Sequence, residues 1–323
     1  MNILITGITG FVGSHLADFI LENHSDCKIS GLRRWHHSRR ENIVHFENKI
    51  EWYDCDLLDP IQTTEVIKLL KPDWIFHCAA ESFVSPSWTH PSLYMDANYK
   101  ATVNLLDALT KNNVKARVHI PGSGEEYGEI DESELPINEL TALRPVNPYA
   151  VTKIAQDLIA YVYFKSYGLE IIRTRAFNHE GPRRDKVFGI PWYAYQISQI
   201  EKGLQEPIMK VGHLEDRRNF THVRDMVEAY WIAMEKCIPG ELYLVGNDNP
   251  NSIYTFREVL DILIKFSTTE KIAYEIVPEF VRPTSVPYLI ADITKFKTLT
   301  GWSPKIPVKQ ILNDTLEYWR TRK

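Results

Sequence analysis

The sequence lacks several features that mark whole classes of protein. Its four cysteines form no C-x-x-C pair and have no metal-ligand spacing, so we expect reduced, mostly buried thiols and no metal site. No segment approaches the run of about 18 apolar residues that spans a membrane. The amino terminus has no basic stretch typical of a targeting signal. These absences favour a cytoplasmic protein without a membrane partner.

Positive charge is not in excess either. The chain carries 37 Lys and Arg against 42 Asp and Glu, a net charge of −5, whereas nucleic-acid-binding proteins are normally basic. Hydrophobic residues make up 44% and charged residues 24% of the 323 residues, as in ordinary globular proteins. This length leaves room for two lobes and a large core.

Strand-like and helix-like segments alternate through the first half of the chain. Apolar or β-branched runs predict strands at 2–7, 28–32, 50–59, 73–80, 116–123 and 169–177. Segments with helical periodicity lie between them, at 8–23, 63–72, 98–112 and from Pro148 onward. This alternation predicts an α/β fold with a doubly wound parallel sheet of Rossmann type. We expect residues 1–178 to form a dinucleotide-binding domain, to which about 215–245 return, and 179–323 to be mainly substrate-binding.

Glycines follow the first predicted strand at a regular spacing. Gly7, Gly10 and Gly13 form G-x-x-G-x-x-G, between a strand and a helix. Glycine there permits a tight turn and a close approach of the backbone to a pyrophosphate, which the helix amino terminus stabilises. The spacing differs from the common G-x-G-x-x-G, and a simple turn is the alternative.

The end of the second predicted strand is basic. Arg33 and Arg34 stand where an NAD-binding site usually has an acidic residue for the ribose hydroxyls. Guanidinium groups suit a 2′-phosphate, which favours NADP over NAD. The alternative is a solvated or subunit-contacting loop. Asp56 either accepts a hydrogen bond from the adenine amino group or caps a helix.

A tyrosine and a lysine lie four residues apart in "YAVTK". On a helix, Tyr149 and Lys153 share one face. The ammonium and a bound nicotinamide cation would both lower the pKa of the phenol and make it a general base. Ser123, at the end of the preceding strand, could bind the same substrate oxygen.

Together these segments resemble the extended short-chain dehydrogenases/reductases that act on nucleotide sugars. "TGITGFVGSH", "DCDLLD", "HCAAES", Ser123 and "YAVTK" carry the resemblance, which covers essentially the whole chain. The segments "RAFNHEGPRR", "EPIMKVGHLEDRRNFTHVRDMVEAYW" and "RPTSVPYLIADITKFKTLTGWSP" resemble the GDP-sugar branch, with GDP-mannose 4,6-dehydratases and related 4-keto reductases. Enzymes that act on GDP-N-acetylglucosamine in legionaminic acid synthesis are also similar. The resemblance adds cofactor contacts at Phe11, Val12, Leu57, Ala79 and Ala80.

The resemblance implies a three-step reaction. Tyr149, helped by Lys153 and Ser123, removes the O4 proton while the C4 hydride moves to NADP⁺. A carboxylate then takes the C5 proton and water leaves from C6. The hydride returns to C6, which gives a GDP-4-keto-6-deoxy sugar without net consumption of cofactor.

Two glutamates in "GSGEEYG" are candidates for the carboxylate. In an extended segment Ser123 and Glu125 would share a face and Glu126 would point oppositely, so Glu125 is the predicted C5 base. The alternative is a glutamate that only hydrogen-bonds a loop. Relatives commonly have Thr at Ser123, and Asp or Ser at Gly124, where the side chain in some of them is the acid for the leaving water, so Glu125 would have to do both jobs here. Related 4-keto reductases also carry acidic residues after this serine, so the motif alone does not decide between dehydration and reduction.

The predicted substrate side is cationic. By resemblance Asn178, Arg184, Arg218 and Arg282 would bind the GDP diphosphate, although each arginine could instead form a structural salt bridge. Glu180, Arg183 and Arg184 resemble the dehydratase version of this loop. The basic loop after Arg33 resembles one that reaches a neighbouring subunit's cofactor, with Arg34 as the contact, so we expect a homo-oligomer, either a dimer or a tetramer.

Three functions remain open from the sequence. The first is a GDP-hexose 4,6-dehydratase, the second an NADPH-dependent GDP-4-keto-6-deoxy-sugar reductase, and the third a non-enzymatic protein of the same fold. Retention of Tyr149 and Lys153 argues against the third. The sequence does not assign the C2 substituent of the sugar. Asp59, His77, His119 and the His36–His37 pair have no predicted chemical role, and His179 is left open.

Overall fold

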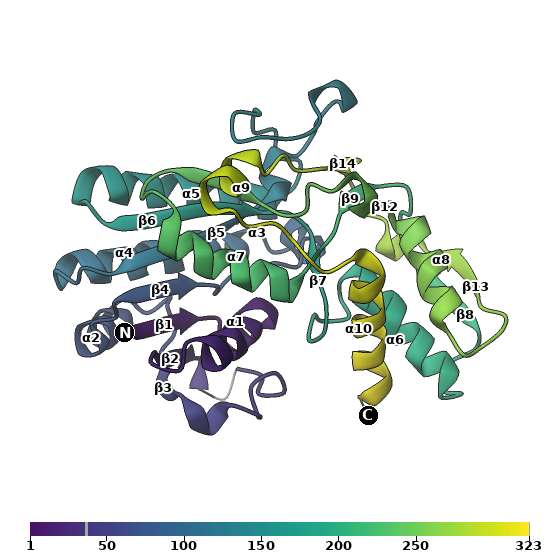
Figure 1. Ribbon diagram of the computed structural model, residues 1–323, viewed down its shortest axis with the longest axis horizontal. Helices are drawn as coiled ribbons and strands as arrows, with labels where there is room; N and C mark the ends of the chain where they lie inside the picture. Colours follow the sequence, from purple (N-terminus) through teal and green to yellow (C-terminus); the bar gives the residue numbers. More distant parts are fainter. Residues whose placement is uncertain (36–37, 323) are drawn as a thin grey trace.

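The structure is a computed structural model that describes residues 1–35 and 38–322 (Figure 1). The His36–His37 pair, for which no chemical role is predicted, lies outside the described residues. Two parts are visible: a large sheet flanked by helices, and a smaller lobe of helices and short strands beyond one end of the sheet's strands.

The large sheet has seven strands, all parallel, in the order β11-β6-β5-β4-β1-β2-β3. Its strands are β1 (Asn2–Thr6), β2 (Lys28–Arg33), β3 (Glu51–Asp54), β4 (Trp74–His77), β5 (Arg117–Ser123), β6 (Glu170–Ala176) and β11 (Leu242–Val245). The order reverses beside β1, which creates a crevice at the carboxyl ends of the central strands. The predicted doubly wound α/β fold is confirmed.

Helices cover both faces of this sheet. They are α1 (Phe11–Asn23), α2 (Pro60–Leu70), α3 (Pro91–Met95), α4 (Ala101–Lys111, after a π-helical turn at Asp96–Lys100), α5 (Pro148–Tyr167), α7 (Val223–Lys236) and α9 (Thr294–Thr300). Alternate residues of β1 belong to different cores, as strand geometry requires. Ile3 and Ile5 pack in the core that includes α1 and α7, whereas Leu4 packs in the core that includes α4.

The smaller lobe has its own core. Helices α6 (Gly189–Glu201), α8 (Phe256–Phe266) and α10 (Val308–Thr321) bury Ile197, Leu260 and Ile311 against one another. Short strands complete it: β7 (His179–Glu180), β8 (Ile208–Val211), β9 (Arg217–Asn219), β10 (Thr221–His222), β12 (Ile253–Thr255), β13 (Ala273–Ile276) and β14 (Tyr288–Leu289).

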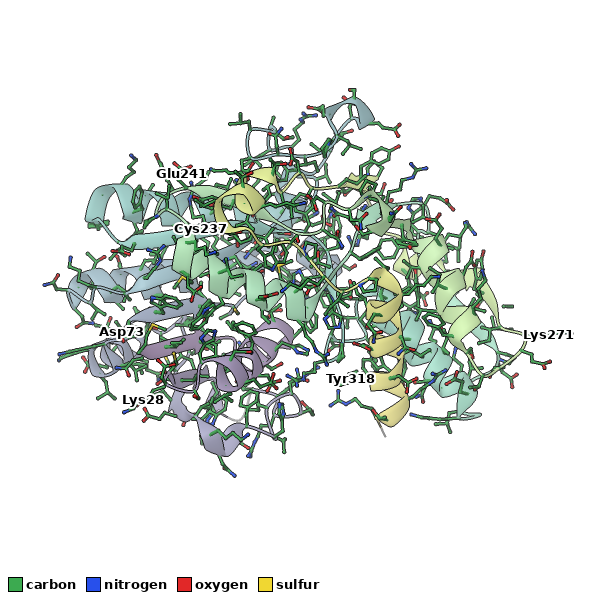
Figure 2. All side chains as sticks on the ribbon, viewed as in Figure 1. Lys28, Asp73, Cys237, Glu241, Lys271 and Tyr318 are labelled. Atoms are coloured by element: carbon green, nitrogen blue, oxygen red, sulfur yellow. The ribbon has the colours of Figure 1, made fainter. Side chains whose placement is uncertain are left out.

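All seven strands of the large sheet run toward this lobe. Figure 2 shows Lys28 and Asp73, at or just before the starts of β2 and β4, on the side of the molecule away from the lobe, and Lys271 on the lobe's far side. The carboxyl ends of the strands therefore face the lobe, and loops from both parts meet there.

Two further features bear on the sequence predictions. In the described part of the chain, no helix combines the length and apolar character needed to cross a membrane. All four cysteines are unpaired. Cys55 and Cys237 are buried and Cys27 and Cys78 are half-buried, so the predicted burial holds fully for two of them.

Candidate active site

The glycine-rich turn after β1 forms a cradle that only glycine can make. Gly7 has φ +65°, and a Cβ there would lie 2.6 Å from the backbone nitrogen of Ala79. A Cβ at Gly13 would lie 2.4 Å from the carbonyl oxygen of Gly7. Helix α1 begins at Phe11 with no side-chain cap and no acidic residue in its first turn. Its free N–H groups therefore suit a pyrophosphate, so these residues fit a dinucleotide cofactor.

One cavity extends from this cradle to the smaller lobe. It brings together thirteen of the residues predicted from the sequence: Gly7, Gly10, Phe11, Val12, Gly13, Ala80, Ser123, Glu125, Tyr149, Lys153, Asn178, Arg184 and Arg282. Six others do not line it: Arg33, Arg34, Asp56, Leu57, Ala79 and Arg218. The cavity thus joins the predicted cofactor cradle, the predicted catalytic residues and part of the predicted substrate side.

Helix α5 holds Tyr149 and Lys153 in its first two turns. The helix starts here because the Asn147 side chain accepts a hydrogen bond from the Ala150 N–H at 2.8 Å and Pro148 occupies the first helical position. The Lys153 Nζ donates to the carbonyl oxygen of Pro121 at 2.6 Å. Tyr149 and Lys153 are both buried, so the two side chains lie on one inward face, as predicted.

Burial changes the proton affinities of both groups. It lowers the pKa of the Lys153 ammonium. It raises the pKa of the Tyr149 phenol, while a hydrogen bond with the Ser123 side chain acts in the opposite direction. The Arg184 guanidinium also lowers this pKa, but burial has the larger effect, so the phenol is protonated at neutral pH. A bound oxidised nicotinamide would supply a further cation.

The two adjacent glutamates have different environments, but not for the reason predicted from the sequence. The chain is not extended beyond Ser123, because Gly124–Tyr127 form a 3₁₀ turn capped by Ser123. Glu125 nevertheless lines the cavity, where its Oε2 accepts a hydrogen bond from Asn147 Nδ2 at 2.9 Å. Glu126 is completely buried beneath the cavity. The expectation that the two side chains diverge is correct, and its extended-strand geometry is wrong.

Gly124 leaves room for an aromatic ring. A Cβ at this position would lie 3.2 Å from the ring of Phe177, which also lines the cavity. Any side chain here would therefore require the ring to shift by a few tenths of an ångström. The absence of a side chain at 124 is therefore matched by the surrounding packing.

The residues after β6 bring charge to the same cavity. The Arg184 Nε lies 3.3 Å from Oε2 of Glu180, its Nη1 donates to the carbonyl oxygen of His179, and its guanidinium lies 4.1 Å from the centre of the Phe188 ring. Burial raises the pKa of the Glu180 carboxyl to about 7, against the opposing effect of Arg184. Asn178 lines the cavity beside them.

His179, left open from the sequence, packs on the glycine-rich turn. Its ring stacks on Phe11 with centroids 5.9 Å apart. Burial lowers the pKa of His179 to about 4, so the ring is neutral at neutral pH. The nearby Arg183 is bound to helix α1 through Asp18, at 2.6 Å. It therefore braces the loop and does not line the cavity.

The two arginines from the later segments differ. Arg282 lines the cavity, and its Nη1 lies 3.9 Å from Oε1 of Glu125. Arg218 is buried behind the cavity wall, where its Nη1 donates to the Arg217 carbonyl oxygen at 2.9 Å and its Nη2 lies 3.5 Å from Asp216. The salt-bridge alternative raised for these arginines thus describes Arg218 better than Arg282.

At the end of β2 the two arginines also separate. The Arg33 Nε donates to Asp54 at 2.9 Å and its guanidinium lies over the Trp52 ring. Arg34 is exposed, and among residues 1–35 and 38–322 its side chain forms no ion pair. In the same loop Arg39 pairs with Asp185 at 2.6 Å. Arg34 is therefore the guanidinium still available to a phosphate.

The helix-cap alternative for Asp56 is wrong. The residue that caps α2 is Asp59, whose Oδ1 accepts from the N–H groups of Ile61 and Gln62. Asp56 instead accepts from the Leu58 N–H at 3.0 Å, in the turn after β3. Asp59, for which no chemical role was predicted, has this structural one.

Several residues near the cavity were either not predicted from the sequence or predicted to have no chemical role. The buried His77 and His119 are bonded to threonines, Thr6 and Thr174, at 2.9 Å, which fits the core explanation. Gln156 accepts a hydrogen bond from the Lys153 Nζ. Asn147 orients Glu125, and its position before Pro148 is a helix-start signal that could have indicated it.

The chain matches one protein family and is similar to several known proteins. Residues 4–315 match the family described as GDP-mannose 4,6 dehydratase. The chain is 28% identical to a GDP-6-deoxy-D-mannose reductase of Pseudomonas aeruginosa, over 99% of this chain and 98% of that protein. It is 29% identical to a GDP-mannose 4,6-dehydratase of Yersinia enterocolitica, over 95% and 91%.

Solved structures agree with this match. RMD from Pseudomonas aeruginosa, solved with NADPH, superposes with a TM-score of 0.85 at 27% identity, covering 100% of this chain and 99% of that one. Similar solved structures hold NADPH or NAD, which supports a pyridine nucleotide cofactor. The chain belongs to the GDP-mannose 4,6-dehydratase family of hydro-lyases, within the extended short-chain dehydrogenases/reductases.

Proposed function

We propose that this protein is a GDP-hexose 4,6-dehydratase, acting on GDP-mannose or GDP-N-acetylglucosamine. The observation that carries the proposal is Glu125. Its carboxylate lies in the same cavity as Ser123, Tyr149 and Lys153 and is oriented by Asn147. Hydride exchange at C4 requires only the tyrosine and its helpers, whereas elimination of water from C5 and C6 also requires a base.

The residues divide the reaction between them. A bound nicotinamide dinucleotide would accept the C4 hydride and later return it to C6. Tyr149, hydrogen-bonded with Ser123, takes the O4 proton, and the Lys153 ammonium would stabilise the phenolate. Glu125 then takes the C5 proton, made acidic by the new C4 ketone. Because Gly124 has no side chain, Glu125 also returns that proton to the departing C6 hydroxyl, so that water leaves. When the hydride reaches C6, C5 gains a proton and Tyr149 releases the one it took from O4, so that the protons balance.

For the cofactor we propose NADP. The exposed Arg34 supports this preference, because it has no ion-pair partner among the described residues at the end of β2. A guanidinium there suits a 2′-phosphate. The same loop could instead reach a neighbouring subunit's cofactor, so we propose a homo-oligomer, a dimer or a tetramer. The unpaired cysteines support a cytoplasmic location.

For the substrate we propose that residues from both parts contribute. Asn178, Arg184 and Arg282 line the cavity and supply amide and guanidinium groups for the diphosphate. Arg218 would add positive charge from behind the cavity wall. In this division residues 1–178, with about 215–245, bind the cofactor, and the remainder of 179–323 binds the nucleotide sugar.

A second candidate is an NADPH-dependent GDP-4-keto-6-deoxy-sugar reductase. Gly124 favours it, because no side chain at this position can act as an acid, and the match to the Pseudomonas reductase covers nearly both chains. Such an enzyme would use Tyr149 as the acid for the new C4 hydroxyl and would not use Glu125 as a base.

Mass spectrometry separates the two candidates. Purified protein is incubated with GDP-mannose or GDP-N-acetylglucosamine, without added nicotinamide. Loss of one water from either sugar would establish the dehydratase and identify its substrate. Unchanged sugars, together with NADPH oxidation by a GDP-4-keto-6-deoxy sugar, would establish the reductase instead.

A further inference from the structure

A row of buried charges lies beneath the cavity, and the reaction described so far does not use it. The Glu126 Oε2 lies 2.7 Å from the Arg175 Nε. The Arg175 Nη2 donates to Asp157 at 2.6 Å, and the Arg173 Nη1 donates to the other Asp157 oxygen at 2.9 Å. Carboxylates and guanidiniums therefore alternate between α5 and β6. Buried charges of this kind need a partner of opposite sign.

The second oxygen of Glu126 holds the turn that carries the reactive groups. It accepts a hydrogen bond from the Ser123 N–H at 2.7 Å, while the Ser123 Oγ accepts one from the Glu125 N–H at 3.2 Å. Gly122 leaves the space for this contact, since a Cβ there would lie 2.4 Å from the Glu126 Oε1. Glu126 thus fixes the backbone from which Ser123 and Glu125 reach the cavity.

The same carboxylate affects the catalytic pair through its charge. Five ionisable groups interact electrostatically with Glu126: Arg175 from β6, Asp157, Lys153 and Tyr149 from α5, and Tyr127 from its own turn. Burial raises the pKa of the Glu126 carboxyl to about 7, against the opposing effects of the Arg175 guanidinium and the Ser123 N–H, which favour its ionised form. When ionised, this carboxylate raises the pKa of both Tyr149 and Lys153.

We propose that Glu126 is a positioning residue for the reaction at Tyr149. Its buried carboxylate fixes the turn that carries Ser123 and Glu125, and it supplies negative charge behind the Tyr149–Lys153 pair. The inference rests on the proposed role of Tyr149 and not on the choice between dehydratase and reductase, because both use this phenol.

The test separates charge from position. The titration of Tyr149 is measured by phenolate absorbance in the NADP⁺-saturated protein, as the difference between each variant and its Tyr149→Phe counterpart. Glu126→Gln should fold, because Arg175 keeps Asp157 as a partner. It should lower the midpoint by about one pH unit, since it removes a buried negative charge.

Glu126→Asp keeps the charge and shortens the side chain. Its midpoint should stay within about 0.3 pH unit of the wild type, while turnover falls about tenfold because Ser123 and Glu125 lose their anchor. Glu134→Gln is the matched control: it removes another capping-box glutamate, paired with Arg144 outside the cavity, and should change neither quantity.

Three results would overturn the inference. The first is an unchanged midpoint in Glu126→Gln, and the second is a shift in Glu126→Asp as large as that in Glu126→Gln. The third applies if Glu126→Gln does not fold: Glu126→Asp would then turn over as fast as the wild type. A protein that fails to dehydrate GDP sugars would still give a readable Tyr149 titration, so failure of the proposed function remains distinguishable.

Discussion

The two sides of the cavity are prepared for their ligands in different ways. On the sheet side, the cradle at Gly7 and Gly13 consists of backbone, fixed by contacts that no Cβ could enter. On the lobe side, the charged groups already have protein partners: Arg184 pairs with Glu180, and Arg282 faces Glu125. We infer that the dinucleotide enters a preformed site, whereas the nucleotide sugar must exchange protein contacts for its own.

The catalytic helix between the two sides gives the largest expected effect. Tyr149→Phe should reduce turnover about a thousandfold, because it removes the proton-transferring oxygen without changing the packing of the ring. Product formation is measured by mass spectrometry, and thermal unfolding checks the fold. Tyr163→Phe on the same helix removes a hydroxyl bonded to Asp107 and should retain wild-type turnover. Equal losses in both variants would contradict the assignment.

Arg34 tests the cofactor side. Arg34→Ala should weaken NADP binding about tenfold to a hundredfold and leave NAD binding unchanged, because only NADP carries the 2′-phosphate. Dissociation constants for both dinucleotides are measured by calorimetry. Arg39→Ala in the same loop, where the guanidinium is paired with Asp185, is the control and should leave both unchanged. A parallel loss of NAD and NADP binding would point to a damaged loop.

Arg282 tests the substrate side. Arg282→Met should raise the KM for the GDP sugar about tenfold with little change in cofactor affinity, because a half-exposed charge–phosphate contact is lost. Arg257→Met in the same lobe removes a guanidinium paired with Glu215 away from the cavity and should have no such effect. An unchanged KM in Arg282→Met would mean that Arg282 does not contact the substrate and interacts only with Glu125.

The smallest effect concerns stability on the lobe side. Burial raises the pKa of Glu180 to about 7, so the folded protein holds this proton more tightly than the unfolded chain. Its stabilising contribution is present at low pH and is lost as pH rises through about 7. Glu180→Gln should therefore unfold like the wild type at acidic pH and be more stable, on the order of 1 kcal/mol, at alkaline pH.

Urea denaturation at acidic and alkaline pH checks this stability prediction. Glu129→Gln, at an exposed position, is the control and should follow the wild type at both. A loss of stability in Glu180→Gln at alkaline pH would contradict this prediction, because it would mean that the ionised carboxylate stabilises the fold through Arg184.

The sheet side was largely predictable from the sequence, because the signals are local. Each signal concerns residues that are close together in the sequence: the strand–helix alternation, the glycine spacing and the four-residue separation of Tyr149 and Lys153. The lobe side was not, because residues such as Arg218 and Arg282 come from short, irregular segments whose environment depends on tertiary contacts. Glu125 and Glu126 illustrate the limit. Their divergence was expected from strand geometry, whereas a 3₁₀ turn and a buried partner, Arg175, produce it.

The most direct test of the proposed reaction follows one atom. A GDP-hexose substrate that carries deuterium at C4 is incubated with the holoenzyme without added nicotinamide, and the product is analysed by mass spectrometry and NMR. Internal hydride return predicts a product that has lost water and carries the deuterium at C6. Recovery of unreacted substrate, or a dehydrated product with no deuterium at C6, would contradict it.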